Sequence, residues 1–437
     1  MSPIHLLPDP TWVAITVPLP PIDPLASAAS GGGASLYWER PAAGEAAAGF
    51  GILASVEEAR PELAWPALDR LASAGQFAWV DGVGEHPPPG PWFGGCAFDL
   101  TRRATPIWSG FPPSKWILPH LLVWRRDGRS YVTAFERAAR AREARALIDE
   151  RLASLEQLVP REKASQLLDG QLRVWSDRKH WGELVDRALR AIEARLLSKV
   201  VLARRVGIAS SHPLDPAAIL AALRQRVPGC TLFCLRSPSG AHFLGATPEV
   251  LCRVNGRSLE TEALAGSAPD PGGPPLPSAD KESREHGAVV EGIDQAIRPL
   301  CDAVEIDAAP SVLGLPYLRH LRTAIRAQLR APVRLSEVVS ALHPTAAVGG
   351  APRDRALTFL ADNEDLDRGW YAGPIGWLGE GTAELVVAIR SALVRGREAQ
   401  LFLGAGVVAG STADGEWEET EAKSRTLLEA MRGERVR

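Results

Sequence analysis

The chain has 437 residues and a formal net charge of -3, from 49 Lys and Arg against 52 Asp and Glu. A hydrophobic content of 46% and a charged content of 23% are typical of a soluble globular protein, and the length predicts more than one domain. The nearly balanced charge argues against nucleic acid as a partner. No apolar run reaches the roughly 18 residues of a membrane span.

The N-terminal segment and the cysteines both indicate a reducing compartment. The first 21 residues have no basic stretch and are interrupted by prolines, so we expect no signal peptide. The five cysteines are Cys96, Cys230, Cys234, Cys252 and Cys301. Their odd number and scattered positions argue against a disulfide framework or a zinc site. We expect buried thiols and a cytoplasmic protein.

The first third predicts short strands joined by tight turns. Strand-like runs lie at 75–80 and on both sides of an Asp-Gly turn within 120–135. A run rich in Ala, Arg, Glu and Leu then predicts a helix over Glu136–Val159. The following connection places a boundary between an N-terminal subdomain, 1–165, and a catalytic domain, 172–437.

The second part alternates clusters of strands and helices. Apolar spacing and turn residues predict helices over 184–196, 213–227, 278–302 (capped by Ser278) and from 415 onward. They also predict a strand over Lys199–Ile208, an antiparallel meander over 229–264 and a hairpin over 383–410 that turns at 395–398. This order favours an α/β or α+β fold with mostly antiparallel sheets over a doubly wound parallel one.

The last predicted helix carries an unusual run of acid, "GEWEETEAKS", at 415–424. At 100° per residue, Glu416, Glu419 and Lys423 share the apolar side of this helix, whereas Glu418 and Glu421 lie on the other side. The first three side chains are therefore expected to point inward, and Glu418 and Glu421 to face water.

The helix predicted after Ser278 shows the same pattern, with Glu282 and Glu285 on or beside its apolar face. Inward carboxylates are costly unless they are paired or bind a cation. Spacing leaves two interpretations open: buried ion pairs with Lys or Arg, and a Mg²⁺ site with few protein ligands.

Lys199 and Glu249 each allow two interpretations. Lys199 lies in the Val- and Leu-rich run "SKVVLAR". It is either an edge residue that reaches water or a buried amine that can act as a base. Glu249 closes a strand after a proline and is, by itself, only an acid at a strand end.

The glycines of "GAGVVAG", Gly404–Gly410, also leave alternatives. A dinucleotide-binding loop needs a helix directly afterwards and an acid about 20 residues on, which this segment lacks. A tight strand end is possible by sequence. A backbone site for an anion fits better, since glycines let N–H groups approach a ligand closely.

Taken together, a series of segments resembles the chorismate-utilising enzymes, and most closely their isochorismate synthases of menaquinone and siderophore pathways. The segments follow the family's order over nearly the whole chain: 92–99, 118–128, "SKVVLAR" (198–204), "FLGATPE" (243–249), "ETEALAGS" (260–267), "KESREH" (281–286), "LHPTAAVGG" (342–350), "RGWYAGPIGW" (368–377), "VAIRSALV" (387–394), "LGAGVVAGS" (403–411) and "GEWEETEAK" (415–423). The resemblance implies the fold of this family, with large, mostly antiparallel sheets packed together and helices outside.

The resemblance also implies a Mg²⁺-dependent reaction on chorismate, in which water attacks ring carbon C2 and the C4 hydroxyl leaves. Lys199 matches the general base for that water, and Glu249 matches the general acid for the leaving hydroxyl. Glu285 and Glu419 match the Mg²⁺ ligands, with Glu416 as a nearby or water-mediated partner.

Other matching positions bind the substrate. Those that hold carboxylates or line the pocket in the family correspond to Ala265, Gly266, Ser267, His343, Tyr371, Arg390, Gly404, Ala405, Gly406 and Lys423. We expect chorismate as the partner, no nucleic acid or membrane, and a monomer or homodimer.

The choice of product depends on two positions. Relatives that use ammonia carry Gln or another residue at the position of Lys199, and aminodeoxychorismate synthases carry a lysine where this chain has Ala265. Both features favour water as the nucleophile and isochorismate as the product. The alternatives are a salicylate synthase, which goes on to eliminate pyruvate, and a non-catalytic structural homologue.

Overall fold

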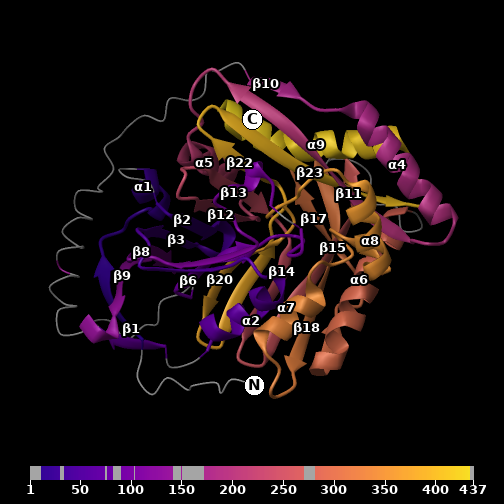
Figure 1. Cartoon of the computed structure of the whole chain (residues 1–437). Coiled ribbons are helices and arrows are strands. Elements are labelled where there is room, and N and C mark those ends of the chain that lie inside the picture. Colours follow the sequence, from indigo (N-terminus) through magenta and orange to yellow (C-terminus); the bar gives the residue numbers. More distant parts are fainter. Residues whose placement is uncertain are drawn as a thin grey trace.

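The computed structural model describes residues 11–29, 34–73, 76–81, 90–102, 104–140, 149, 172–269 and 281–433. Within this part of the chain the strands form two large sheets, with helices on the outside (Figure 1). The one parallel pair among the described strands is β1–β5, so the expectation of mostly antiparallel sheets is confirmed.

The larger sheet has thirteen strands in the described part of the chain. Its order is β10 (Leu172–Trp175), β11 (Lys199–Ser210), β23 (Glu398–Val408), β22 (Ser391–Arg395), β13 (His242–Thr247), β12 (Thr231–Arg236), β2 (Leu36–Arg40), β3 (Glu45–Phe50), β8 (Leu121–Arg126), β9 (Arg129–Arg137), β1 (Trp12–Leu19) and β5 (Phe77–Asp81), while β19 (Gly350–Ala351) also pairs with β11.

The second sheet has ten described strands. Its order is β16 (Cys301–Ile306), β18 (Leu318–Leu329), β15 (Ser258–Pro269), β14 (Val250–Asn255), β21 (Thr382–Val387), β20 (Pro374–Gly379), β6 (Trp92–Cys96), β7 (Ser114–Leu118) and β4 (Ala54–Glu58), while β17 (Ser311–Leu315) pairs with β18. Both sheets run without a break from N-terminal to C-terminal strands, through β2–β12 and β6–β20. The division at 165–172 stays a prediction.

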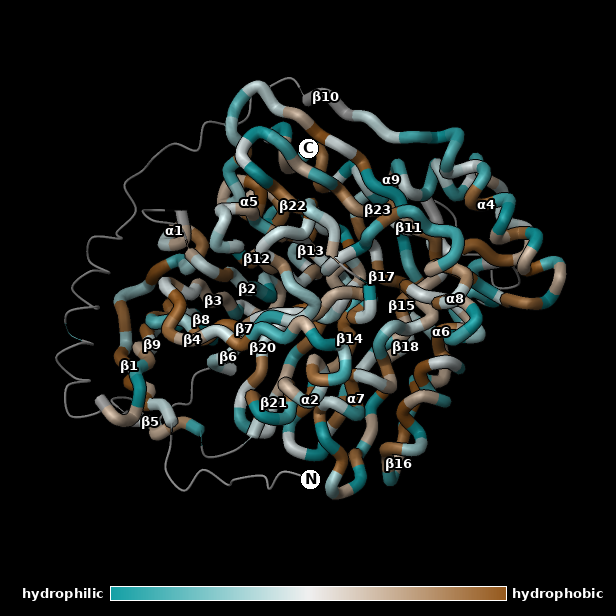
Figure 2. The backbone as a smooth tube through the Cα atoms, viewed as in Figure 1, coloured by the Kyte–Doolittle hydropathy of each residue, from teal (hydrophilic) through white to brown (hydrophobic). Residues whose placement is uncertain are grey.

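The helices cover the outer faces of the sheets. They are α1 (Pro24–Ala29), α2 (Pro61–Leu71), α4 (Arg178–Glu193), α5 (Pro216–Arg226), α6 (Lys281–Ile297), α7 (Leu335–Leu342), α8 (Arg353–Asn363) and α9 (Ala413–Arg432). The largest core cluster joins side chains of both sheets, such as Trp124 and Phe243 with Trp116 and Leu385. A second cluster lies under α5 and α9. Hydrophobic residues run along the strands, and α4 is mainly hydrophilic on its exposed side (Figure 2).

The sequence explains how α9 begins and ends. The hydroxyl of Thr412 accepts a hydrogen bond from the N–H of Gly415 at 3.1 Å, which satisfies one of the free donors of the first turn. Gly433 ends the helix in the left-handed conformation, with φ of 67°. Between these caps the helix presents Leu427, Ala430 and Met431 to the core.

The chain passes from one sheet to the other at two neighbouring points. Pro248 and Glu249 connect β13 in the larger sheet to β14 in the other, and residues 388–390 connect β21 back to β22. The two crossings are hydrogen-bonded to each other. Thr247 Oγ1 donates to the carbonyl of Val387 at 2.7 Å, and the Val387 N–H donates to the carbonyl of Glu249 at 3.0 Å.

These crossings correct two predictions. The segment 229–264 is not one meander, because β12 and β13 belong to the larger sheet and β14 and β15 to the other. Likewise, only β22 and β23 form the predicted hairpin with its turn at 395–398, since the strand before them lies in the other sheet. Strand propensity is local, whereas the choice of sheet depends on distant partners.

Two helix predictions were wrong at their ends. Glu136 and Arg137 continue β9 instead of starting a helix, a 3₁₀ turn follows at Ala138–Arg140, and most of the remaining predicted helix lies outside the described residues. The helix predicted to reach residue 302 ends at Ile297, and β16 begins at Cys301, where it pairs with β18. Ser278 lies outside the described residues.

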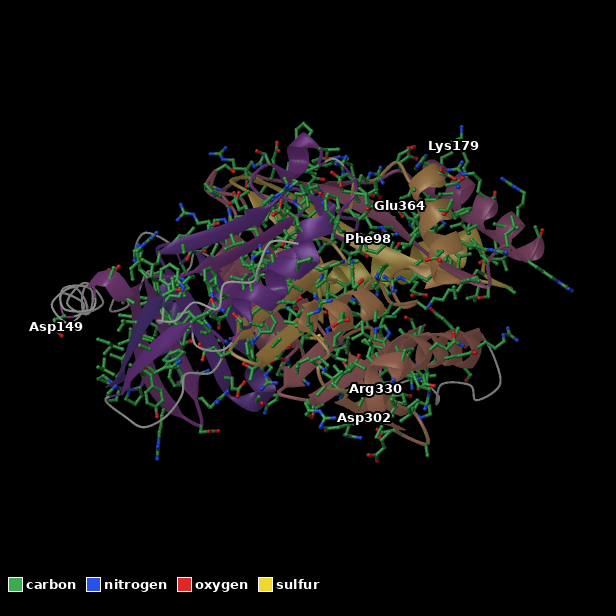
Figure 3. The ribbon with its side chains drawn as sticks, turned by 60° about the horizontal axis from the view of Figure 1, so that its bottom comes forward. Phe98, Asp149, Lys179, Asp302, Arg330 and Glu364 are labelled. Carbon is green, nitrogen blue, oxygen red and sulfur yellow. The ribbon has the colours of Figure 1, made fainter. Side chains whose placement is uncertain are left out.

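The edge of the ten-stranded sheet formed by β16 is charged. Asp302 in β16 and Arg330 after β18 lie side by side there, 3.7 Å apart, and both are about half exposed (Figure 3). Charge on an edge strand discourages pairing with another chain. None of the helices in the described part of the chain is long and apolar enough to cross a membrane.

Candidate active site

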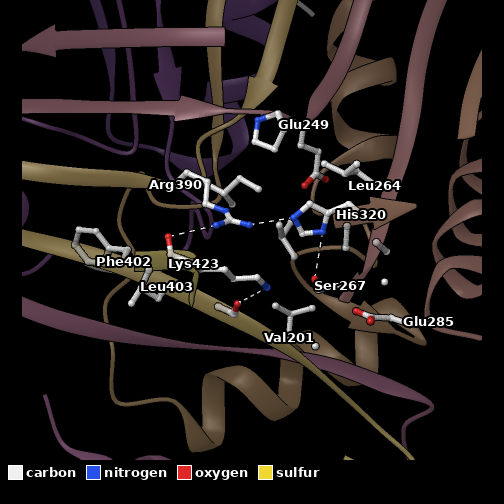
Figure 4. A pocket seen from close by; sticks show the side chains of 18 of the residues that line it. Val201, Glu249, Leu264, Ser267, Glu285, His320, Arg390, Phe402, Leu403 and Lys423 are labelled. Atoms are coloured by element: carbon white, nitrogen blue, oxygen red, sulfur yellow. Dashed lines mark hydrogen bonds between the residues drawn. The ribbon is translucent and has the colours of Figure 1, made fainter. Parts of the chain in front are cut away.

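A cavity lies beside the two crossings, between the ends of both sheets and the helices α6 and α9 (Figure 4). It brings together ten of the residues that the sequence predicted: Glu249, Ala265, Gly266, Ser267, Glu285, Tyr371, Arg390, Gly404, Gly406 and Lys423. Its apolar walls are Val201, Pro248, Leu264, Ala347, Val348, Ile389, Phe402 and Leu403. The cavity therefore has apolar walls on which several charged and polar groups converge.

Lys199 is the first residue of β11 and is buried, with 1% of its surface exposed. Of the two interpretations from sequence, the buried amine is correct. Its Nζ lies 2.9 Å from Glu285 Oε1 of α6, and the geometry is that of an ion pair rather than of an aligned hydrogen bond. Gly406 of β23 makes room for this pair: a Cβ there would lie 2.4 Å from Glu285 Oε1 and 3.1 Å from Lys199 Cε.

Glu249 sits at the first crossing and is buried. Burial raises the pKa of its carboxyl to about 8, and the nearby charge of Glu262 contributes to the rise. The positive charges of Lys199 and Lys423 and a hydrogen bond from Thr345 act in the opposite direction on this pKa. Around neutral pH the carboxyl therefore keeps its proton and is a donor, which a general acid requires.

Helix α9 presents its inner side to the site as the helical wheel predicted. Glu416 is buried, and the side chains of Glu419 and Lys423 are 18% and 15% exposed. Lys423 Nζ lies 2.5 Å from Glu419 Oε1 and donates to the carbonyl of Gly404 at 2.9 Å. Glu418 is exposed, as expected. Glu421 is only half exposed, because it forms an ion pair with Arg204 of β11.

Arg390 and Tyr371 bring two more polar groups to the cavity. Arg390, at the second crossing, has φ of 51°, a conformation uncommon outside glycine and frequent at functional sites. Burial lowers the pKa of its guanidinium, and burial raises the pKa of the Tyr371 hydroxyl. The Tyr371 ring stacks on Phe402 at 5.5 Å, and a Cβ at Gly404 would lie 2.7 Å from the Tyr371 hydroxyl.

His320 of β18 is a cavity residue that sequence reasoning missed (Figure 4). Arg390 Nη2 lies 3.1 Å from its Nε2, and Ser267 Oγ lies 3.2 Å from its Nδ1. Burial, then the charges of Arg390 and Lys423, hold the imidazole pKa well below its ordinary value. The ring is therefore neutral.

The tautomer of His320 follows from these contacts. A guanidinium can only donate, so Nε2 accepts and Nδ1 carries the proton. Nδ1–H then donates to Ser267 Oγ, which leaves the hydroxyl proton of Ser267 available to a ligand. The only sequence signal for His320 was a histidine inside a strand-like run, which is also the pattern of an ordinary core histidine.

Five predicted residues do not line the cavity. Lys199, Glu416 and Glu419 belong to the elements around it, and the other two, His343 and Ala405, point elsewhere. His343 does not line this cavity: its Nε2 donates to the carbonyl of Phe98 at 3.0 Å, and burial lowers its pKa to about 4. His343 anchors the start of the loop that carries Thr345. The Thr345 hydroxyl is hydrogen-bonded to Glu249, and the sequence prediction did not include Thr345. Ala405 is fully buried on the opposite face of β23 from Gly404 and Gly406, because side chains alternate along a strand.

The oxygen donors near the cavity suit a hard cation. Among the described residues, no three His, Cys, Asp or Glu side chains gather closely enough to hold a metal ion. Glu285 of α6 and Glu419 of α9 are each paired with a lysine instead, the first pair beside Gly406 and the second beside Gly404. Mg²⁺ prefers one or two protein carboxylates, with its other coordination positions filled by water and substrate oxygens, and Glu285 and Glu419 fit that pattern.

The fold and this cavity define a class of protein, the chorismate-utilising enzymes. The chain belongs to the family described as chorismate binding enzyme, whose model matches residues 5–432. It is 32% identical to the salicylate biosynthesis isochorismate synthase of Pseudomonas aeruginosa, over 97% of this chain and 90% of that protein. It is 35% identical to the isochorismate synthase MenF of Escherichia coli, over 74% of this chain and 78% of that protein.

Solved structures agree with this assignment. MenF, the menaquinone-specific isochorismate synthase of Escherichia coli, superposes with a TM-score of 0.78 at 28% identity, over 97% of this chain and 95% of that one. Component I of the anthranilate synthase of Streptococcus pneumoniae has a TM-score of 0.68 at 20% identity, over 83% and 85% of the two chains, which shows the shared fold alone. The predicted fold class is confirmed.

Proposed function

We propose that this chain is an isochorismate synthase, which converts chorismate to isochorismate. The proposal rests on one observation: a buried carboxyl that keeps its proton, Glu249, lines a cavity whose other polar groups suit a dianion, and a buried lysine, Lys199, is paired with Glu285 of the cavity lining. The named relatives support the same reaction.

The two groups divide the proton transfers between them. Lys199 takes a proton from the water that attacks ring carbon C2, and Glu249 gives its proton to the C4 hydroxyl, which leaves as water. One water enters and one leaves, so the product is an isomer of the substrate. The proton on Lys199 then returns to Glu249 through solvent, which restores both groups.

Lys199 can act as a base only after it loses its proton. Its Nζ is paired with Glu285 Oε1, on a residue that the family resemblance assigns to the metal. A cation bound by Glu285 would replace Lys199 as the partner of that carboxylate. Glu285 and Glu419 would hold Mg²⁺, with Glu416 behind them, and the metal would supply positive charge for a substrate carboxylate between these acids.

The positive groups opposite the acids would bind the substrate carboxylates. Arg390 and Lys423 supply charge, Tyr371 and Ser267 supply hydroxyl donors, and the glycines of β23 keep space for the close approach of a ligand. The five cysteines are free and buried, as predicted, which fits the reducing cytoplasm where we propose that the enzyme works.

Product identification tests the proposal. The protein is incubated with chorismate and Mg²⁺, with and without ammonium, and the products are separated and identified by mass. Isochorismate alone is the expected result. Salicylate with pyruvate would indicate a salicylate synthase, an aminated product would refute water as the nucleophile, and no turnover would indicate a non-catalytic homologue.

A further inference from the structure

A second buried carboxylate lies behind Glu249. Glu262 of β15 is 5% exposed. Its Oε1 accepts a hydrogen bond at 3.0 Å from the N–H of Val250, the residue directly after Glu249. Its Oε2 lies 2.6 Å from Nε of Arg322 on β18. The ion pair with Arg322 and the hydrogen bond from Val250 hold the carboxylate of Glu262 against the backbone that carries the general acid.

Glu262 does not line the cavity, so it is not a ligand for the substrate. The ionisable groups that face the site of Glu249 come from every element around it: Lys199, Glu285, His320, Tyr371, Arg390 and Lys423. Among the neighbours that act on Glu249, Lys199 and Lys423 favour its charged form, and Glu262 is the main anion that opposes them. Burial is the largest cause of the raised pKa of Glu249, and without Glu262 it would act alone against the two lysines and the Thr345 hydroxyl.

We propose that Glu262 is a positioning residue whose fixed negative charge keeps the carboxyl of Glu249 protonated and ready to donate. The role of Glu249 as general acid rests on the proposed function, whereas its protonation by Glu262 can be measured without turnover. Burial of Glu249 is the largest cause of its raised pKa, and the charge of Glu262 adds to it. The arginine and the backbone N–H hold Glu262, so its charge stays in place behind Glu249.

A purely structural role for Glu262 predicts a different outcome. Through Val250 and Arg322, Glu262 also ties β14 and β18 to β15. Loss of that tie would lower activity equally at every pH. Loss of the charge instead lowers the pH at which Glu249 ionises, so the decline of kcat/KM on the alkaline side begins at lower pH.

The test compares Glu262→Gln with Glu260→Gln. Glu260 lies two residues earlier on the same strand, carries the same charge and is exposed, so it is a matched control. Infrared spectra of the full chain without substrate are recorded across pH, and Glu249→Gln identifies the carboxyl band of Glu249. Glu262→Gln is expected to lower the midpoint of that band by about one pH unit or more, and Glu260→Gln to leave it in place. On the alkaline side, kcat/KM should fall about tenfold for each pH unit by which this midpoint decreases.

Two further results decide the matter. If Glu262→Gln does not fold, Glu262→Gln combined with Arg322→Gln removes the pair without leaving an unpaired arginine, and the same decrease of the midpoint is expected. An unchanged midpoint of the Glu249 band in a folded variant overturns the inference, whatever happens to activity. A lowered midpoint in a protein that does not convert chorismate supports the inference and refutes the proposed function.

Discussion

The buried Lys199 forms an ion pair with Glu285, which lines the cavity, with 2.9 Å between Nζ and Oε1. The lysine begins β11 and the glutamate lies in the first turns of α6. The sequence predicted a base and a metal ligand at these two positions. In the structure they are paired with each other, so a cation that binds Glu285 would compete with Lys199 for the same carboxylate.

Replacement of Lys199 by alanine should abolish most turnover. General base catalysis contributes about 10²- to 10⁴-fold, so we expect kcat to fall by that factor, with circular dichroism showing a folded chain. Lys179→Ala on α4 is the control, because Lys179 is exposed and remote from the cavity. A Lys199→Ala enzyme within tenfold of the wild-type kcat would contradict the assignment.

Activity should depend on the proton of Glu249. Because its pKa is about 8, kcat/KM is expected to decline as pH rises above that value, since the carboxylate cannot protonate the leaving hydroxyl. Glu249→Gln should lower kcat about 10²-fold or more at all pH values. Initial rates across pH measure both effects, and a profile that rises steadily to high pH would refute the role of general acid.

The same proton links Glu249 to stability. Its pKa rises from 4.5 to about 8 on folding, so the folded chain binds this proton more tightly than the unfolded chain. The contribution of Glu249 is then fully present below about pH 4.5 and is lost as pH rises through about 8. Denaturant unfolding measures the free energy of unfolding of wild type and Glu249→Gln at about pH 6 and at about pH 9. The wild-type value should fall, relative to that of Glu249→Gln, between the lower and the higher pH. An equal difference at both pH values would contradict this.

Glu285 and Glu419 should both be needed for Mg²⁺. We expect Glu285→Gln and Glu419→Gln each to weaken Mg²⁺ binding, by roughly tenfold or more, as a charged ligand is lost. Calorimetric titration with Mg²⁺ alone measures this without relying on turnover. Glu418→Gln, on the exposed side of α9, is the matched control. Equal Mg²⁺ affinity in all three variants would refute the assignment of the metal site to Glu285 and Glu419.

His320 should act on substrate binding through its two contacts. His320→Leu removes the acceptor for Arg390 and the donor for Ser267, and we expect KM for chorismate to rise about tenfold or more, as for a lost hydrogen bond to a charged group. His320→Asn can still donate to Ser267 and should recover part of this loss. His212→Asn, at an exposed histidine, is the control. Identical KM values for His320→Leu and wild type would contradict the role.

Gly406 should tolerate no side chain. Gly406→Ala places a Cβ 2.4 Å from Glu285 Oε1, so the carboxylate must move away from Lys199. We expect kcat to fall by at least about tenfold, because small displacements of catalytic groups are costly. Gly314→Ala in β17 is the control, since nothing lies within 4 Å of its added Cβ. Wild-type kinetics for Gly406→Ala would mean that this close approach is dispensable.

The sequence predicted best where the pattern is local. The positions of Glu416, Glu419 and Lys423 on the inner side of α9 followed from 3.6 residues per turn, and the structure confirms all three. The prediction that Glu421 faces water was only partly right, because Glu421 pairs with Arg204, which lies far away in the chain on β11. A helical wheel gives the direction of a side chain and says nothing about what it meets.

Spacing could not choose between an ion pair and a metal ligand for Glu285 and Glu419. The structure shows both carboxylates paired with lysines, and the family resemblance supplied the metal that we propose. The two interpretations are compatible, because a lysine can hold a carboxylate until another cation engages it.

By itself, the sequence determined the inward acids, the glycines and the family, through periodicity, residue size and ordered motifs. Only the tertiary structure decided that Glu249 and Arg390 occupy neighbouring crossings between the two sheets, and that His320 and Glu262 stand beside them. These relationships depend on strand pairings between residues 49 or more positions apart, such as β15 with β18 and β14 with β21. Pairing of that kind is set by the packing of the whole chain, because hydrogen-bonded partners in a sheet leave no local periodicity to identify them.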